Sequence, residues 1–539
     1  MSDPLDDLDP LAPFAWHPEP ELIGIRDAGR SRAALERAGE VTWRAALDWL
    51  YDEAMRRAMG EPAGYADLRR AFFGPSLGPA PAPADPQTLD DVLDEFRTRI
   101  APHTLNSFHP RALSYFTPPP LVASIVGEVL AQWINQGIDI WHAGPVGAFV
   151  EEEVIRWLCD LVGYGPGSFG LLTSGGVMAN FIAMALVRDV HLRRLAGLDR
   201  APRGAALEGV RVYTGDQSHF SIARALDELG FPPETLAVVP TDDRFRLHAA
   251  PIAEAIAHDR AIGIRPLAIA AVAGSTNTGS VDLVPELAAL ARAQGLWLHV
   301  DAAYGGGALL SQRDGPRVAG LDLADSVTVD PHKWFFQAYD IGGLVVRHGD
   351  DLRQTFDRTP EYYRGGEGAA SPNAGAGEDA ATDDADAHDS HAGQLNFYKL
   401  GMEGTRRFRA LKLWATWKHL GTSGLARLIE SNDDVAAYLA ASIAACDDFE
   451  AVPVVPELSV VCFRHLPGGA VVAHHLPADD LDTHQDRLAA ALEASGDGWL
   501  STTSLRGATY LRAGVVNYLT TTADIDRLLA TLRRLAAEG

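Results

Sequence analysis

The sequence predicts an α/β protein built on a mainly parallel β-sheet, and three observations support this fold class. Short β-rich runs recur between about residues 120 and 345, among them "PLAIAAVAGS", "LWLHVDAA" and "DSVTVD". The segments between them, such as "DLVPELAALARAQG", have the pattern of amphipathic helices that end in Gly. The chain has 539 residues, 47% hydrophobic and 22% charged, which is ample for a large core.

The chain before the sheet region is expected to be helical. Residues 1–40 are predicted to be an acidic extension and 41–119 a helical segment. Within that segment, "TWRAALDWLYDEAMRRAM" (42–59) has apolar residues at helical spacing, and "TLDDVLDEFRTRIAP" (88–102) is a second helix with Thr88 as its N-cap.

The sheet region and the rest of the chain are expected to form two further domains. Residues 120–415 are predicted to be a large domain and 416–539 a smaller α+β domain, closed by the helix "TADIDRLLATLRRLAAEG". Residues 365–393 interrupt the large domain with Gly, Ala, Asp and Ser. Because this insert has almost nothing to bury, we expect it to be disordered and dispensable.

Composition limits the partners and the compartment. The formal net charge is −26, which argues against nucleic acid or an anionic membrane as a partner. No apolar run approaches the ~20 residues that span a bilayer, and the N-terminus lacks the pattern of a signal peptide. The three cysteines show no metal-ligand spacing and fit a reducing compartment. We therefore expect a soluble cytoplasmic protein.

Lysine usage points to one position. The chain contains only four lysines among 46 Lys and Arg residues, and Lys333 is kept in the apolar stretch "VTVDPHKW". A lysine in a desolvated pocket loses its proton readily and becomes a nucleophile, which arginine, with a pKa above ~12, cannot do. The position therefore suggests an amine that binds a carbonyl carbon.

Three more features lie at apparent strand ends. Gly175 and Gly176 in "LLTSGGVMANF" precede a helix, where free N–H groups suit a phosphate. His219 stands before another amphipathic helix, and Asp301 ends an apolar strand. Each alone also fits a structural role: an ordinary glycine turn, a structural histidine, an aspartate that caps a turn. Together with Lys333 they match the needs of pyridoxal phosphate (PLP), namely a phosphate cradle, a partner for the pyridine nitrogen, a ring-stacking imidazole and an amine.

With these residues the sequence resembles the group II PLP-dependent decarboxylases of fold type I, which include aromatic-L-amino-acid, glutamate and 2,4-diaminobutyrate decarboxylases. Seven stretches match in order over about 85–539, excluding the insert: "HPRALSYF", "TSGGVMAN", "DQSHFSIARA", "GSTNTGSVD", "HVDAAYGGG", "DPHKWFF" and "RRFRALKLW". The resemblance implies a seven-stranded, mainly parallel sheet, PLP as cofactor, and a homodimer with the active site at its interface, the N-terminal helices packing on the partner.

The resemblance also implies roles by position. Lys333 matches the lysine that carries the cofactor, Asp301 the partner of the pyridine nitrogen and His219 the stacking histidine. The other matching cofactor-binding positions are Ala303 under the ring, Thr276 beside its substituents, His332 before the lysine, and Gly175 and Gly176 at the phosphate. There are two departures. Val177 stands where many members have Ser, and Asp330 stands where several have Asn, which places a carboxylate near the phosphate unless it points away.

A tyrosine on a loop is the last implied residue. "FDRTPEYYRGG" (356–366) matches the family's active-site loop, so Tyr362, or its neighbour Tyr363, is expected to deliver a proton to the substrate's α carbon. Members with Phe at this position tend to make aldehyde, which predicts amine as the product here.

The implied activity is decarboxylation of an L-amino acid to the amine and CO₂, with an aromatic amino acid favoured by "RRFRALKLW" and "SYF". The alternatives are 2,4-diaminobutyrate or glutamate as substrate, an aldehyde-forming member of the family, and a PLP-binding protein without turnover. The intact set of Lys333, Asp301 and His219 argues against the last of these.

Overall fold

The computed structural model describes residues 28–58, 64–76, 78, 81–85, 87–358, 394–453 and 455–538. The predicted loop residues Tyr362 and Tyr363 and the 365–393 insert lie outside the described residues. The chain divides into two compact units, Met1–His109 and Pro110–Gly539. The predicted domain boundaries at 40/41, 119/120 and 415/416 stay predictions.

The first unit is helical. Its elements are α1 (Ala28–Asp48), continued by the π-helical turn η2 (Trp49–Ala54), α2 (Tyr65–Phe73) and α3 (Leu89–Glu95), continued by η4 (Phe96–Ile100). Thr88 caps α3 as predicted, because its hydroxyl accepts the backbone N–H of Asp91 while the Asp91 carboxylate accepts the N–H of Thr88.

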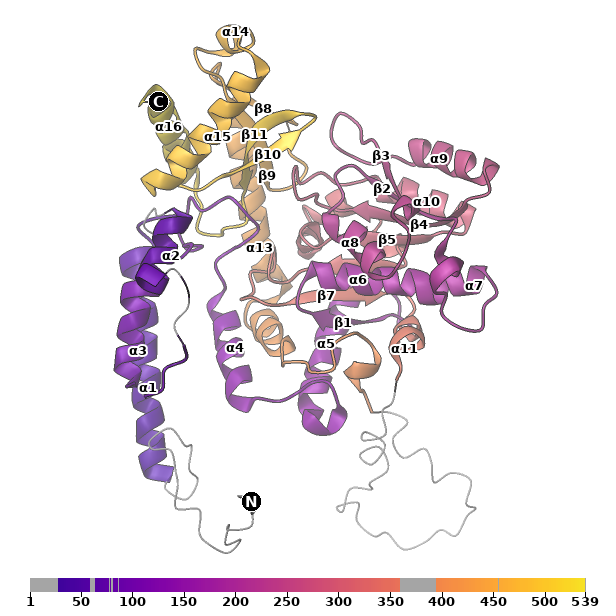
Figure 1. The fold of residues 1–539 in the computed structure, drawn as a ribbon, viewed down its shortest axis with the longest axis horizontal. Helices are drawn as coiled ribbons and strands as arrows, with labels where there is room; N and C mark the ends of the chain where they lie inside the picture. The colour runs from indigo at the N-terminus through magenta and orange to yellow at the C-terminus, as the bar shows by residue number, and fades with distance from the viewer. Residues whose placement is uncertain are drawn as a thin grey trace, which may run out of the picture. The chain divides into compact units, whose positions relative to one another are not determined.

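The second unit contains a large sheet and a small one (Figure 1). Its strands are β1 (Phe169–Thr173), β2 (Val210–Gly215), β3 (Leu236–Val239), β4 (Arg265–Val272), β5 (Trp297–Asp301), β6 (Ser326–Val329), β7 (Gly342–Val346), β8 (Phe449–Ala451), β9 (Val460–His465), β10 (Ser501–Leu505) and β11 (Ala508–Gly514). Its helices are α4 (Val122–Ile134), α5 (Pro145–Val162), α6 (Gly176–Leu186), α7 (Arg193–Leu195), α8 (Phe220–Glu228), α9 (Ala249–Ala261), α10 (Val284–Gln294), α11 (Asp350–Phe356), α13 (Ala410–Ala444), α14 (Ala470–Ala473), α15 (Ala478–Ser495) and α16 (Thr522–Glu538).

The large sheet has seven strands in the order β1-β7-β6-β5-β4-β2-β3. β7 pairs antiparallel with both of its neighbours, and the remaining pairs are parallel. Strands β5, β6 and β7 are buried at every residue, because helices cover the sheet. This confirms the predicted α/β class and the mainly parallel seven-stranded sheet.

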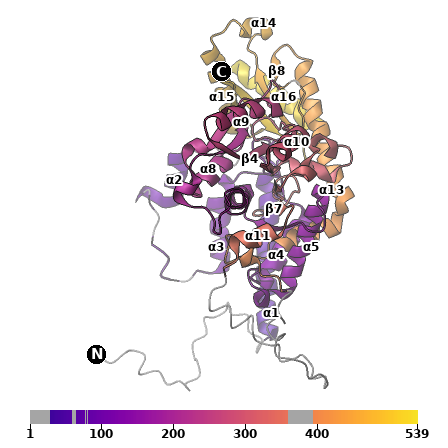
Figure 2. The ribbon, with the colours of Figure 1, turned by 90° about the vertical axis from the view of Figure 1, so that its right-hand side faces the viewer.

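The small sheet is antiparallel, in the order β10-β11-β9-β8. It packs with α15 and α16 around a second core, and in both views it lies with α14 and α16 at one end of this unit (Figure 1 and Figure 2). Of the five apolar positions expected on one face of the closing helix, α16 buries Ile525, Leu528, Leu529 and Leu532, and Leu535 is partly buried.

Helix α13 joins the two cores. It runs through the predicted 415/416 boundary and is interrupted only at Gly421, whose φ of 64° is the left-handed conformation that glycine adopts readily. Leu413, Leu425 and Ile429 belong to the core of the large sheet, whereas Leu439 and Ile443 belong to the core of the small one. The change from one core to the other therefore occurs inside a continuous helix.

Candidate active site

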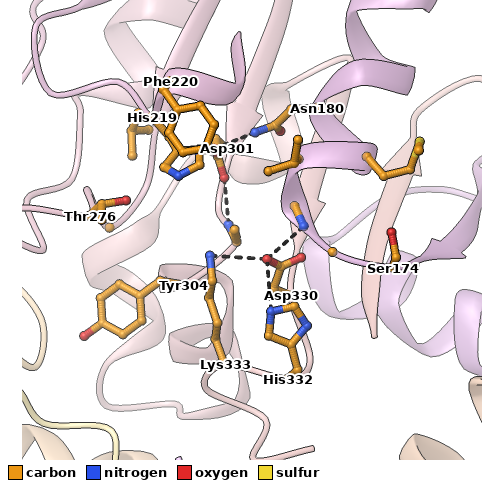
Figure 3. Close-up of a pocket in the computed structure, with 17 residues that line it drawn as sticks. Ser174, Asn180, His219, Phe220, Thr276, Asp301, Tyr304, Asp330, His332 and Lys333 are labelled. Atoms are coloured by element: carbon orange, nitrogen blue, oxygen red, sulfur yellow. Dashed lines mark hydrogen bonds and ion pairs between the residues drawn. The ribbon is translucent and has the colours of Figure 1, made fainter. Parts of the chain in front are cut away.

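A cavity of about 380 Å³ opens at the carboxyl ends of the central strands (Figure 3). β4 ends at Val272, β5 ends at Asp301, and Asp330 follows β6 directly; all three residues line the cavity. Eight residues predicted from the sequence also line it: Gly175, Gly176, His219, Thr276, Asp301, Ala303, His332 and Lys333. Side chains from points far apart in the chain are therefore brought to one place.

Lys333 meets Asp330 in this cavity. The lysine Nζ lies 3.2 Å from Asp330 Oδ2, and the same oxygen accepts the backbone N–H of Gly176 at 3.0 Å (Figure 3). Asp330 is only 2% exposed, and its Oδ1 has no hydrogen-bond partner among the described residues. The carboxylate therefore points toward the glycine turn and not away from it. It would repel a phosphate bound at that turn.

The glycine turn begins helix α6. A Cβ atom on Gly176 would stand 2.8 Å from Asp330 Oδ2, so the close approach of this carboxylate leaves no room for a side chain. The turn is supported from below, where Gly175 N–H donates to Thr173 Oγ1 at 3.2 Å. Val177 is 39% exposed at the rim of the cavity and supplies no hydroxyl.

Asp301 is a buried carboxylate with two donors. Its Oδ2 accepts from Asn180 Nδ2 at 2.7 Å, and its Oδ1 accepts the backbone N–H of Ala303 at 3.1 Å (Figure 3). Both contacts bring an N–H donor to a carboxylate oxygen. Asp301 is therefore held in a state that can accept a further N–H donor from a ligand.

Two histidines line the cavity, and burial lowers the pKa of both. His219 is the N-cap of α8, and its Nδ1 accepts the backbone N–H of Ser221 at 3.3 Å. Burial is the largest influence on the pKa of His219, and nearby Asp301 opposes it. His332 accepts from the N–H of Ile341 through Nδ1 at 3.4 Å, and burial lowers its pKa against the influence of Asp330. Both rings are therefore expected to be neutral near pH 7.

The structure adds residues that sequence reasoning missed. Asn180 lies in the quoted "TSGGVMAN" stretch, four residues after Gly176, and its contact with Asp301 required the fold. Arg512 lies near the C-terminus, and its Nε donates to the carbonyl of Thr276 at 2.8 Å. It lines a neighbouring cavity of about 400 Å³ that shares Thr276 with the first. A buried arginine inside the β-rich run "ATYLRAGVV" was the available signal.

The comparisons with known proteins decide the family. A family model described as the pyridoxal-dependent decarboxylase conserved domain matches residues 75–376 and 385–466. The chain belongs to this family. It is 31% identical over 430 residues to the aromatic-L-amino-acid decarboxylase of Bacillus atrophaeus, a match that covers 80% of this chain and 82% of that protein.

The chain is also similar to a second decarboxylase and to a solved structure. The L-2,4-diaminobutyrate decarboxylase of Acinetobacter baumannii is 27% identical over 454 residues, covering 82% of each chain. The crystal structure of Oryza sativa TDC with PLP and tryptamine has a TM-score of 0.81 and 24% identity, and covers 96% of this chain and 99% of that one, which shows a shared fold. The predicted family, the PLP cofactor and the class of carboxy-lyase are confirmed.

The cavity fits PLP. The glycine turn at the start of α6 suits a phosphate, Lys333 supplies an amine, and Asp301 supplies a carboxylate acceptor for a ring nitrogen. The one poor match is Asp330, whose carboxylate takes the Gly176 N–H that a phosphate would use. Among the described residues, no cluster of His, Cys, Asp and Glu could hold a metal ion. None of the helices in the described part of the chain could cross a membrane.

Proposed function

We propose that this pyridoxal-dependent decarboxylase removes the carboxyl group of an aromatic L-amino acid and releases the amine. The observation that carries the proposal is the meeting of Lys333, Asp301 and His219 around one cavity beside a glycine turn. When bound, PLP supplies an electron-withdrawing ring that takes up the electron pair of a bond broken at the substrate's α carbon. The residues that line the cavity would bind and orient the cofactor and the substrate.

Three side chains form what we call the ring end of the cavity: Asn180, His219 and Asp301. Asp301 would hold the pyridine nitrogen, because a buried carboxylate oxygen stabilises an N–H donor. His219 and Ala303 also line the cavity, where they would contact the two faces of the cofactor ring. Thr276, also in the cavity lining, would contact the ring substituents.

Gly175, Gly176 and Asp330 form what we call the phosphate end. The N–H groups at the start of α6 would hold the phosphate. Lys333, which lines the cavity, would hold the aldehyde carbon of the cofactor through Nζ. His332 is buried beside Asp330, with its Nε2 3.7 Å from Asp330 Oδ2. It helps to position Lys333, the next residue.

Arg512 is the proposed partner of the substrate's carboxylate. Among the described residues, Lys333 is the one Lys or Arg that lines the first cavity, and Arg512 is the one that lines the second. Lys333 is assigned to the cofactor, which leaves Arg512 for the substrate. One terminal nitrogen of Arg512, Nη2, is buried without a hydrogen-bond partner among the described residues. A buried guanidinium with a free donor is suited to a carboxylate. Fixing that carboxylate aligns the bond to be broken and selects decarboxylation.

The aromatic class is supported by the apolar lining of the first cavity, which includes Phe220, Tyr304 and Met178, and by the similarity to the Bacillus enzyme. A second candidate substrate is 2,4-diaminobutyrate, because Glu493 lines the neighbouring cavity and could pair with a second amine. Measuring CO₂ release across the common L-amino acids and 2,4-diaminobutyrate distinguishes the two. Release from 2,4-diaminobutyrate alone would overturn the aromatic assignment.

We also propose Tyr362 as the residue that delivers the proton to the α carbon, with Tyr363 as the alternative. Both lie outside the described residues, after helix α11 ends at Phe356. Tyr362→Phe should shift the product from amine toward aldehyde and peroxide, because the reactive carbon then persists long enough to meet O₂. Amine alone at the parental rate would exclude Tyr362. Tyr363→Phe is the matched control.

A homodimer is supported by an apolar stripe on α4. Its members share one helical face and are 45% to 72% exposed: Val122, Val126, Val129, Leu130 and Trp133. An exposed stripe of this kind marks a protein interface. Trp133→Glu should give a monomer in light scattering, whereas Val471→Glu on α14, also exposed, should not. A dimeric Trp133→Glu variant would exclude this face.

We further propose that the N-terminal helices cover the partner subunit, since Tyr51 and Tyr65 are exposed in the first unit. A cytoplasmic location is supported by Cys159, Cys446 and Cys462, all of which are free thiols. Reporter fusions followed by cell fractionation test the location.

A further inference from the structure

Asn180 makes four hydrogen bonds in the fully buried layer between α6 and the sheet. Its Nδ2 donates to Asp301 Oδ2 at 2.7 Å and to Ser221 Oγ at 2.8 Å. Its Oδ1 accepts from Thr328 Oγ1 at 2.6 Å and lies 3.0 Å from His299 Nε2. Two donors and two acceptor sites are the whole capacity of a side-chain amide, so all of them are used.

The strand register explains why these partners meet. In the β5–β6 pair, His299 lies opposite Ser326 and Asp301 lies opposite Thr328. Residues two apart on a strand share a face, so these four side chains form one patch, and α6 presents Asn180 to it. Asn180 is thus joined to the cofactor carboxylate and to the sheet at once.

The two oxygens of Asp301, both of which face N–H donors, fix the orientation of the amide. A carboxylate cannot donate, so the Asn180 atom beside it must be Nδ2, and Oδ1 must face Thr328 and His299. His299 then carries its proton on Nε2. Its Nδ1 lies 2.9 Å from Ser326 Oγ, which also accepts from Trp297 Nε1 and so donates its own proton to the ring. Each hydrogen bond in this network therefore has one assigned donor and one assigned acceptor.

The hydrogen bonds of Ser221 also determine which nitrogen of His219 carries the proton. Ser221 Oγ accepts from Asn180, so its proton is free to donate to His219 Nδ1 at 2.8 Å. The backbone N–H of Ser221 is directed at the same nitrogen. Nδ1 therefore carries no proton, and the ring's proton is on Nε2.

We propose that Asn180 is the positioning residue of the ring end: it holds Asp301 as an acceptor and, through Ser221, holds His219 as a neutral imidazole protonated on Nε2. His219 then offers the cavity an N–H donor and is a poor source of a proton for the product. This inference rests on the proposed placement of the cofactor ring between Asp301 and His219. It leaves the delivery of the product's proton to another group.

The first test measures cofactor binding. Apoenzyme is titrated with PLP, following the visible absorption of the bound cofactor and its pH midpoint. Asn180→Asp removes both donors and sets a second carboxylate beside Asp301, so PLP affinity should fall by about tenfold or more and the pH midpoint should differ from that of the parent. Thr328→Val is the control, because it removes one contact to Oδ1 and leaves the Nδ2 donors. It should lower the melting temperature while keeping affinity within about twofold.

The second test needs no change at Asn180. Ser221→Ala removes the hydroxyl that donates to His219 Nδ1, so the ring should protonate more easily. Asp301 and Asp330 favour a charged His219, whereas burial, Lys333 and Arg224 oppose it, and all of these remain in the variant. A charged ring beside a protonated pyridine weakens binding, so the acid limb of PLP affinity should move up by about half a pH unit.

The outcomes distinguish the role of Asn180 from the proposed placement of the cofactor ring. If Asp301→Asn leaves the cofactor spectrum unchanged, the placement of the ring itself is wrong. If Asp301→Asn changes the spectrum while folded Asn180→Asp matches the parent, only the role of Asn180 is overturned. If Asn180→Asp does not fold, Ser221→Ala decides, and an unmoved acid limb overturns the inference.

Discussion

At the ring end of the cavity every polar atom of Asn180 has a partner, whereas at the phosphate end Asp330 Oδ1 is buried without one among the described residues. The ring end is linked to the sheet by a chain of directed hydrogen bonds. At the phosphate end one carboxylate oxygen serves both the Gly176 N–H and the Lys333 ammonium. A fully bonded network resists rearrangement, and a shared one can exchange partners. We infer that the ring end is preorganised and that the phosphate end adjusts when the cofactor arrives.

The largest expected effect is at Lys333, where the two ends meet. Lys333→Ala should abolish both turnover and the visible absorption of bound PLP, because arginine side chains cannot replace its amine. Absorption spectroscopy and a CO₂ assay measure this. Lys418→Ala, an exposed lysine on α13, is the control and should keep both. Activity retained in Lys333→Ala would remove the basis of the proposed function.

The next effect tests the rigid ring end. Asp301→Asn keeps the shape of the side chain and removes its charge, so the electron-withdrawing power of the cofactor falls. Turnover should drop by about a hundredfold or more, a typical loss for a preorganised electrostatic contact. Steady-state kinetics check this, with the fully exposed Asp243→Asn as control. A loss of less than about threefold would mean that Asp301 does not face the ring nitrogen.

A smaller effect, of opposite sign, tests the adjustable phosphate end. Asp330→Asn removes a negative charge beside the proposed phosphate, so PLP should bind several-fold to about tenfold more tightly. Pyridoxal has no phosphate, so any change in its affinity reflects the effect of the substitution on Lys333 alone. The ratio of the two affinities, measured by fluorescence titration of apoenzyme, should therefore rise in the variant. An unchanged ratio would show that Asp330 does not contact the phosphate.

The smallest effect concerns stability. Burial lowers the pKa of His299 to about 4, from 6.5. Between these values the unfolded chain binds more protons at this residue than the folded chain, so its contribution makes the unfolding free energy rise with pH. His299→Gln removes that contribution, and the slope should decrease by up to about 1.4 kcal/mol per pH unit between about pH 4 and 6.5. Urea unfolding at several pH values measures the slope, with exposed His419→Gln as control. Equal slopes would mean that His299 is not held neutral.

Sequence patterns predicted the parts of this protein that depend on local chemistry. Alternating strand and helix patterns predicted the α/β sheet, because periodicity follows from which face of an element is buried. The scarcity of lysine singled out Lys333, and the strand-end positions of Asp301 and His219 predicted one shared edge of the sheet. The family and its cofactor followed from those motifs in order, and the comparisons confirm both.

What only the tertiary structure decided is which of these groups touch. Thr328 and Asp301 are placed opposite each other by strand register, and Asn180 reaches both from α6, more than 120 residues earlier in the chain than Asp301. Arg512 reaches Thr276 across 236 residues. The direction of the Asp330 carboxylate, toward Gly176, depends on the packing of the turn after β6 against the start of α6. Sequence specifies the kind of side chain at each strand end, but hydrogen bonds form over about 3 Å, and only the packed fold fixes positions that closely.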